Sequence, residues 1–493
     1  MEFMSVLLRC LRYIPMPLPD NFLALLFAVL VILFAGAVMF YTIVQDPLRF
    51  TRLERLAYCY PLGLAALAMP MFLMSWAGFH IWVLPVLIFI GLVAVTAYAI
   101  RRIFPATLWK RNPQAVPMEA FTEFEWFLLL IIVGCLVVRT LTSLAIPLND
   151  GDGHAIWCFK AKILYFDTIR TTDYFTRNEL SYSHTRYPLL VPLMYAWVST
   201  VVGHWDDMGM FILNPINLVA FAILLYCTLR KFAARPVALM VTAILSSLPA
   251  LMHYAECGQA DVPLMLISGS ALFCLFDWIQ SRRMSSIVLS AFLIGGALFT
   301  KEEGKILFGA HALVAGLSIF IAAPRSEHKR LLGHLGLYLI IGFLWIIPWL
   351  IFQRTIPVGE EQFRPVTFSN IRWDQIPTLC HTVFQNAMRL YNGFGLPKWN
   401  FLWPIIVLFL VVSKAPRFYP YNCLVLVFIL HASAVSLVWL CTTDSLTLEA
   451  NEAGWERYTL IMMPPILLVF GKCLNKWWGR WQAPETDINA RLQ

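Results

Sequence analysis

The sequence predicts an all-α polytopic membrane protein with about 13 spans, and three observations lead to that prediction. Of its 493 residues, 59% are apolar and only 13% are charged, and the mean hydropathy of +0.69 is far above what a soluble domain needs. Long apolar windows recur along the whole chain. Basic residues gather in alternate connections between these windows, so the net charge of +8 reflects membrane topology and we expect no nucleic-acid partner.

The apolar windows define the expected spans in chain order. Each is long enough, or nearly so, to cross about 30 Å of hydrocarbon. The windows cover residues 22–44, 56–76, 80–100, 124–147, 209–229, 237–254, 262–279, 286–300, 306–323, 332–352, 400–413, 419–440 and 458–472. A further apolar segment, 187–203, has Pro188 and Pro192 in its first turns. We expect it to be re-entrant or to lie along the interface rather than to cross.

The basic loops assign the two faces of the membrane. Lys and Arg cluster at 49–55, 101–111, 230–235, 282–283, 325–330, 414–417 and 472–480, which the positive-inside rule places in the cytoplasm. The external connections are then 148–186, 255–262, 300–305, 353–399 and 441–457, and most of the acids lie there. A positive inner face leaves acids to the outer one in any membrane protein. Asp261 and Glu303, however, are pressed against helix ends in very short loops, where a charge is costly without a role or a partner.

The stretch "IPLNDGDGHAIWCFKAKILYFD", residues 146–167, opens the first large external loop. Pro147 ends the fourth span, and the two glycines after it break any helix, so Asp150 and Asp152 lie in a short turn at the water interface. Apolar and charged residues then alternate at helical spacing over 155–167, which predicts an amphipathic helix on the outer leaflet with Lys160 on its polar face. The same acids could also simply cap that helix, because Asp is favoured at helix N-termini.

Five short segments, in this order along the chain, resemble the GT-C superfamily of integral-membrane glycosyltransferases, which includes protein O-mannosyltransferases and lipid A aminoarabinose transferases. The segments are "NDGDGHAIWCFKAK", "HTRYPLLVP", "AECGQADVPLML", "FTKEEG" and "NEAGWERY". The resemblance implies a GT-C-like transmembrane helix bundle as the catalytic domain at 124–472. A three-span N-terminal extension would then precede it at 1–123, and a cytoplasmic tail would follow at 473–493. The extra spans and the lack of a recognisable soluble C-terminal domain depart from familiar members.

The resemblance also implies chemistry on a polyprenyl-phosphate sugar. Because the lipid phosphate is a good leaving group, the protein must stabilise its developing charge with cations and deprotonate an acceptor hydroxyl with a carboxylate. We expect Asp152, and as second choice Asp150, to be the base. The phosphate contacts are expected from Arg186, Lys301, Arg457 and Arg139, and the sugar or acceptor contacts from Asp261, Glu303, Tyr187 and Trp157. Arg139 lies inside the fourth span, where it either has a function or extends its charged end to the interface.

The expected cofactor, cellular location and alternative functions rest on fewer residues of the sequence. Asp150 and Asp152 have the Asp-x-Asp spacing of metal-dependent sugar-nucleotide enzymes, so a divalent metal is possible, but Arg and Lys alone can neutralise one phosphate and no cofactor is required. The absence of any Asn-x-Ser/Thr acceptor site favours a bacterial inner membrane with the active site facing the periplasm or exterior. The acceptor is a glycan, a lipid or a protein. A transporter or flippase of a polyprenyl-linked glycan, or a non-catalytic assembly subunit, remains an alternative.

Overall fold

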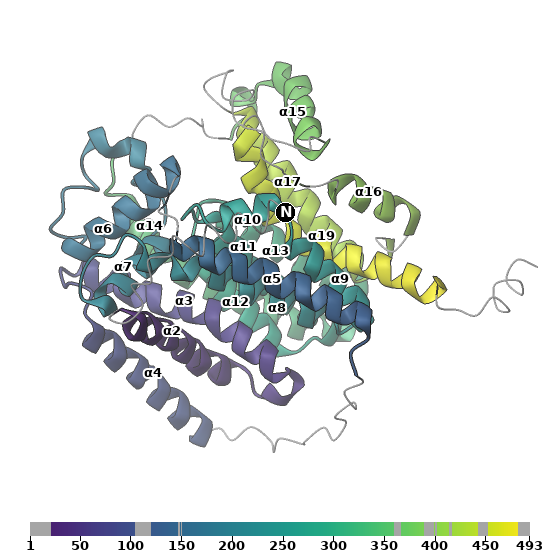
Figure 1. The fold of residues 1–493 in the computed structure, drawn as a ribbon, viewed down its shortest axis with the longest axis horizontal. Coiled ribbons are helices and arrows are strands. Elements are labelled where there is room, and N and C mark those ends of the chain that lie inside the picture. Colours follow the sequence, from purple (N-terminus) through teal and green to yellow (C-terminus); the bar gives the residue numbers. More distant parts are fainter. Residues whose placement is uncertain are drawn as a thin grey trace, which may run out of the picture.

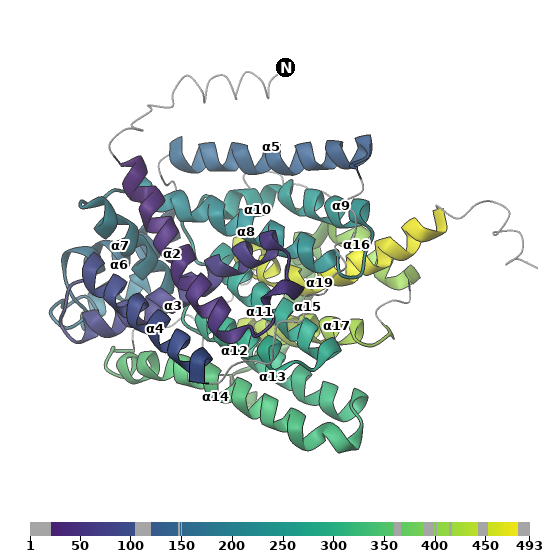
Figure 2. The same cartoon turned by 90° about the horizontal axis from the view of Figure 1, so that it is seen from below.

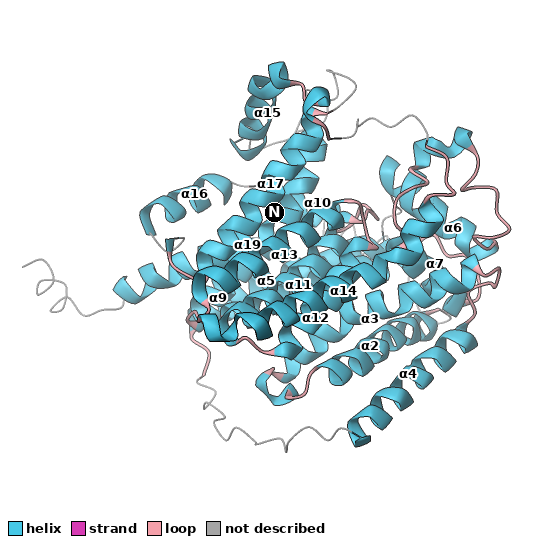
Figure 3. Ribbon diagram, turned by 180° about the vertical axis from the view of Figure 1, so that it is seen from behind, coloured by secondary structure: helices cyan, strands magenta, loops and turns pink. Residues whose placement is uncertain are grey.

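The computed structural model consists of helices joined by loops over the residues it describes, and no strand occurs in that part of the chain (Figure 3). It describes residues 21–103, 120–145, 148, 150–358, 366–388, 399, 402–413, 417–441 and 452–481. The first helices are α2 (Phe22–Ile43), α3 (Arg52–Trp76), α4 (Val83–Ile103), α5 (Glu123–Ala145), α6 (Phe159–Phe166), α7 (Leu190–Val202), α8 (Leu213–Leu229), α9 (Arg235–Ser246) and α10 (Pro249–Tyr254). The later ones are α11 (Asp261–Ser281), α12 (Met284–Leu298), α13 (Glu303–Ala322), α14 (His328–Gln353), α15 (Ile376–Met388), α16 (Leu402–Ser413), α17 (Tyr421–Leu440) and α19 (Glu452–Trp481).

Nine helical segments among the described residues are long and apolar enough to cross a membrane. The predicted fold class, an all-α polytopic membrane protein, is confirmed, whereas the predicted number of 13 full spans is not. Four of the expected windows contain apolar helical stretches of only 10–17 residues, and one of these four, the window at 237–254, is divided into α9 and α10. Pro249 begins α10, and because proline cannot donate a backbone hydrogen bond to the preceding turn, one continuous helix is interrupted there. Segment 187–203 forms α7, whose 13 residues extend about 20 Å.

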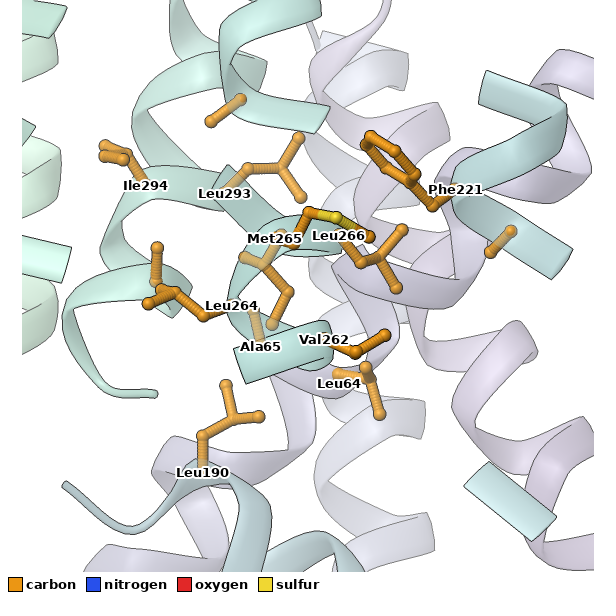
Figure 4. Packing of buried hydrophobic residues seen from close by; sticks show 14 of the residues in the cluster. Leu64, Ala65, Leu190, Phe221, Val262, Leu264, Met265, Leu266, Leu293 and Ile294 are labelled. Atoms are coloured by element: carbon orange, nitrogen blue, oxygen red, sulfur yellow. The ribbon is translucent and has the colours of Figure 1, made fainter. Parts of the chain in front are cut away.

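The core of the bundle lies around α11, which is buried along almost its whole length. Helices α3, α8, α12 and α19 pack against it. Figure 4 shows side chains of α11, such as Leu264 and Leu266, among residues of α3, α8 and α12. A helix that is apolar on every side is expected in such a central position. The first residue of α11, Asp261, is therefore held at the centre of the molecule by the packing of the whole helix.

The first three described helices pack against the rest of the bundle rather than forming a separate body (Figures 1 and 2). Helices α2 and α3 contact each other backbone to backbone at two glycines. A Cβ atom on Gly36 would lie 1.6 Å from the carbonyl oxygen of Cys59, and one on Gly63 would lie 1.9 Å from that of Ile32. Small residues allow this close approach between apolar helices. Helix α3 also packs on α7, α8 and α12, whereas α4 lies outside α2.

The predicted N-terminal extension and C-terminal tail can be compared with the helices of the structure. The predicted extension at 1–123 contains α2, α3 and α4. Its residues 1–20 and 104–119 are not among the described residues. The predicted tail at 473–493 does not begin where α19 ends, because that helix continues to Trp481. The domain boundaries and the assignment of the two faces stay predictions.

Candidate active site

Five side chains from distant parts of the sequence form a continuous series of ion pairs, which we call the ion-pair cluster. Its members, in order of contact, are Asp152, Arg457, Asp261, Lys301 and Glu303. Arg457 Nη1 lies 2.5 Å from Asp152 Oδ2, and Arg457 Nε lies 3.2 Å from Asp261 Oδ2. Lys301 Nζ lies 2.9 Å from both Asp261 Oδ1 and Glu303 Oε1. The structure thus brings together five of the ten residues that the sequence predicts for the site.

The ion-pair cluster extends from the interior of the bundle to its surface. Asp261 is fully buried, and Lys301 and Glu303 are buried beside it. The side chain of Asp152, at the other end of the series, is 48% exposed. Buried charges are costly unless they are paired, so the inner residues depend on one another. The outer carboxylate remains accessible to a molecule arriving from solvent.

Helix ends position the inner carboxylates. Asp261 is the first residue of α11 and Glu303 the first residue of α13, while Arg457 lies within the first turns of α19. The first turn of a helix has unpaired N–H groups and a partial positive charge. Such ends stabilise carboxylates and also bind phosphate groups. The starts of α11 and α13 therefore add to the attraction that Lys301 and Arg457 exert on an anion.

Lys301 lies in the turn between α12 and α13, and its neighbours determine its charge. Burial alone would lower the pKa of Lys301, but the carboxylates of Asp261 and Glu303 outweigh it, so the pKa is raised above its usual value. The ammonium group also lies over the ring of Tyr458, 5.6 Å from its centroid. Lys301 is thus a permanent cation in the interior of the site.

Aromatic side chains border the ion-pair cluster on one side. The ring of Tyr187 stacks on His184 with centroids 4.6 Å apart and lies 5.9 Å from the ring of Trp157. His184 interacts electrostatically with Asp152 and Arg457, which places these rings next to the cluster. Burial raises the pKa of Tyr187, so its hydroxyl keeps its proton. The predicted residues Tyr187 and Trp157 therefore face the same region as the charged groups.

The two acids of the Asp-x-Asp pair have different partners. Asp150 Oδ2 accepts hydrogen bonds from the backbone N–H of Gly153 at 2.6 Å and from Gln259 Nε2 at 2.7 Å. Asp152 makes no capping hydrogen bond and is paired with Arg457 instead. The capping explanation therefore applies to Asp150. Within the described residues, no group of three or more His, Cys, Asp or Glu side chains is arranged to hold a metal ion. Metal independence stays a prediction.

Arg139 lies apart from the ion-pair cluster. Its Nη1 is 2.6 Å from Glu256 Oε1, and the Thr142 hydroxyl donates a hydrogen bond to the same carboxylate. An arginine inside a span was expected to have a function or to reach the interface. The structure pairs Arg139 with Glu256 in the loop before α11, and a role of Arg139 at the phosphate stays a prediction.

Arg186 lies beside the ion-pair cluster. Its Nη1 donates to the carbonyl of Ile356 at 3.1 Å. Gln353 Nε2 donates both to the carbonyl of Arg186 at 2.7 Å and to Glu302 Oε1 at 3.2 Å. Because Glu302 follows Lys301 directly, this bridge holds Arg186 near the inner cation. It also connects α14 to the site.

Sequence reasoning missed two residues near the site, Lys160 and His184. The amphipathic pattern placed Lys160 on a polar face in contact with water, but the structure buries it completely. The neighbouring positions on its face of the helix are Ile156, Trp157 and Leu164, which are all buried. A lysine at the centre of an apolar stripe was the signal that could have identified it.

Asp150→Ala is expected to reduce stability without abolishing function. The change removes the acceptor for Gly153 and Gln259, so the free energy of unfolding should fall by about 1–2 kcal/mol. Thermal unfolding of the purified protein in detergent measures this effect. Asp150→Asn is the control, because an amide oxygen still accepts the Gly153 N–H and stability should stay near that of the wild type. An Asp150→Ala protein as stable as the wild type would contradict the capping role.

Comparisons with known proteins find similarity over part of the chain. Residues 186–352 match the family model described as dolichyl-phosphate-mannose-protein mannosyltransferase. These residues include Arg186, Tyr187, Asp261, Lys301 and Glu303, and the predicted resemblance to the GT-C superfamily is confirmed there. A solved structure, ArnT from Cupriavidus metallidurans bound to undecaprenyl phosphate, is 15% identical with a TM-score of 0.46, over 73% of this chain and 62% of that one. No curated protein matches the chain.

Proposed function

We propose that this chain is a membrane glycosyltransferase that transfers a sugar from a polyprenyl-phosphate donor to an acceptor. The observation that carries the proposal is the match of residues 186–352 to a family named for a dolichyl-phosphate-mannose donor. Three members of the ion-pair cluster, Asp261, Lys301 and Glu303, fall within the matched residues. The sugar is a hexose or a pentose.

The cations of the cluster are proposed to stabilise the leaving group. When the bond between the anomeric carbon and the phosphate oxygen breaks, negative charge grows on the lipid phosphate. Lys301 and Arg457 are already fixed by their carboxylate partners, so no reorganisation is needed when this charge develops. The starts of α11 and α13 add partial positive charge in the same place. Arg186 is proposed to be a further contact to the phosphate.

Asp152 is proposed to be the base of an inverting single displacement. Its carboxylate is the exposed end of the cluster, where an acceptor hydroxyl can approach and give up its proton. Arg457 contacts both Asp152 and Asp261, so it fixes the base relative to the donor site. The acceptor oxygen then attacks the anomeric carbon on the side opposite the phosphate.

The remaining predicted residues are assigned supporting roles. Asp261 and Glu303 hold the cations and are within reach of sugar hydroxyls, and Tyr187 and Trp157 offer aromatic faces to a sugar ring. Arg139 braces the loop before α11 through Glu256 instead of contacting phosphate. The site is proposed to face the periplasm or exterior of a bacterial inner membrane, with no metal required.

Cell-free transfer tests the proposal. The purified chain in detergent is incubated with radiolabelled sugars on a polyprenyl phosphate and with envelope glycans, lipids and proteins as acceptors. We expect label to move to one acceptor class, with free polyprenyl phosphate as the second product. Lys301→Met serves as the inactive control and Lys305→Met, whose pair with Glu302 is partly exposed, as the active one. Movement of an intact lipid-linked glycan across vesicles without transfer would favour the flippase instead.

A further inference from the structure

Lys160 is a fully buried lysine next to the proposed site. It lies in α6, and its Nζ donates a hydrogen bond of 2.5 Å to the backbone carbonyl of His184. The same atom lies 5.6 Å from the centre of the Trp157 ring and 5.5 Å from that of Tyr187. An ammonium group can form favourable contacts with aromatic faces, but these contacts do not neutralise its charge.

The structure provides Lys160 with no carboxylate partner among the described residues, in contrast to Lys301. Taking an unpaired ammonium group out of water costs several kcal/mol, so such a residue either loses its proton or receives an anion. Burial lowers the pKa of Lys160 well below its usual range. A buried lysine without an anion is unfavourable for a purely structural position, where leucine or methionine would fill the same space.

The net charge of the ion-pair cluster is negative, so a further cation would favour the binding of a phosphate. Its three carboxylates and two basic groups carry one net negative charge, which would repel a phosphate monoanion. The two basic groups are Arg457 and Lys301, and each already contacts carboxylates. A donor phosphate is therefore stabilised by further positive charge at close range, in addition to the charge that Arg186 is proposed to supply.

His184 connects Lys160 to the ion-pair cluster. It accepts the hydrogen bond from Lys160 through its carbonyl, and its ring interacts electrostatically with Lys160, Asp152, Arg457 and Lys301. His184 also adopts a left-handed backbone conformation with φ of 48°, which costs energy for a residue other than glycine. The ring of His184 stacks on that of Tyr187, whose other contacts include the Lys160 ammonium group.

We propose that Lys160 is a further binding residue for the donor, and that its ammonium group pairs with the phosphate of the polyprenyl-phosphate lipid beside the rings of His184 and Tyr187. This inference rests on the proposed function, because it assigns a residue to the donor of that reaction. In the free protein Lys160 donates to the His184 carbonyl. In the complex one of its N–H groups donates to a phosphate oxygen, and the proton that gives Lys160 its full charge comes from solvent.

Binding of undecaprenyl phosphate tests the assignment without requiring sugar transfer. Isothermal titration of the full chain in detergent, in two buffers of different ionisation enthalpy, gives both the affinity and the protons taken up. At alkaline pH we expect the wild type to take up protons when it binds the lipid, because burial lowers the pKa of Lys160 in the free protein and the bound anion raises it again. His184 does not contribute there, because burial and the neighbouring Lys160 lower its pKa to about 4.

Two variants of the same helix provide the comparison. Lys160→Met keeps the length of the side chain and should bind the lipid at least about 10-fold more weakly, with proton uptake lost. Lys162→Met is the matched control, because Lys162 lies over Trp205 on another side of the helix, and it should bind like the wild type. The wild-type proton count is informative even if Lys160→Met fails to fold.

The outcomes separate this inference from the proposed function. Lipid binding by the wild type without proton uptake, or unchanged affinity and uptake in Lys160→Met, would overturn the role of Lys160 and leave the glycosyltransferase proposal intact. Failure of the wild type to bind undecaprenyl phosphate at all would overturn both. Inorganic phosphate is titrated in parallel, and we expect it not to bind. Equal proton uptake with inorganic phosphate would overturn the assignment to the lipid donor.

Discussion

Asp152→Asn is expected to lower the rate of sugar transfer by about 100-fold or more, the contribution usually made by general-base catalysis. Asparagine has the size of aspartate but accepts no proton from a hydroxyl. The side chain of Asp152 is the exposed carboxylate of the cluster and makes no capping hydrogen bond, so its loss should not disturb α6. Transfer of labelled sugar and binding of undecaprenyl phosphate are measured on the same purified protein.

Binding of the donor should survive in Asp152→Asn, because the cations that hold the phosphate remain. Removal of the carboxylate frees one contact of Arg457, which keeps its pair with Asp261. Asp150→Asn is the matched control and should transfer at nearly the wild-type rate. Wild-type transfer by Asp152→Asn would eliminate this residue as the base. Equal loss in both variants, together with inhibition by chelators, would instead indicate that the pair holds a metal.

Lys301→Met is expected to cause the largest loss of stability. The change removes a cation that pairs with the carboxylates of Asp261 and Glu303 in the interior of the bundle. Breaking a buried ion pair by removing one partner costs about 3–5 kcal/mol, because the remaining charge is left in a poorly solvating environment. Thermal unfolding in detergent should show a correspondingly lower midpoint. Sugar transfer should be lost, since Lys301 is also a proposed phosphate contact.

Lys305→Met is the matched control, because it removes a lysine from an exposed ion pair instead of a buried one. Lys305 lies one turn further along the chain and pairs with Glu302, and its side chain is 39% exposed. An exposed pair of this kind contributes up to about 1 kcal/mol. If Lys301→Met unfolds at the same temperature as Lys305→Met, then the inner part of the ion-pair cluster does not stabilise the bundle.

Much of the site could be predicted because its charges interrupt an apolar sequence. Asp261, Lys301 and Glu303 lie in connections of a few residues between apolar windows, where a charge needs a partner. Because successive spans run in opposite directions, alternate connections between them lie on the same side of the membrane. Charged residues in these connections can therefore come into contact. The pairing of Lys301 with both carboxylates is consistent with that expectation. Arg457 was found by its place in the last external segment rather than by any local pattern.

Other features depended on packing that no local pattern reveals. Asp150 and Asp152 are two residues apart and chemically identical, yet one caps a helix and the other pairs with Arg457. Lys160 was expected to face water because it alternates with apolar residues, but the structure buries it beside Trp157, Tyr187 and the His184 carbonyl. Arg139 was expected at the phosphate site, and only the folded chain shows that it pairs with Glu256.

The sequence by itself determined that this protein is an all-α membrane protein, which of its segments are apolar helices, and which short connections carry charge. These properties follow from the hydropathy of neighbouring residues and need no knowledge of distant ones. Only the tertiary structure decided which charges meet and which are buried. The contact of Arg457 with Asp152 joins residues 305 positions apart, and ion pairing depends on separations of a few ångströms that the packing of α6, α11, α13 and α19 establishes.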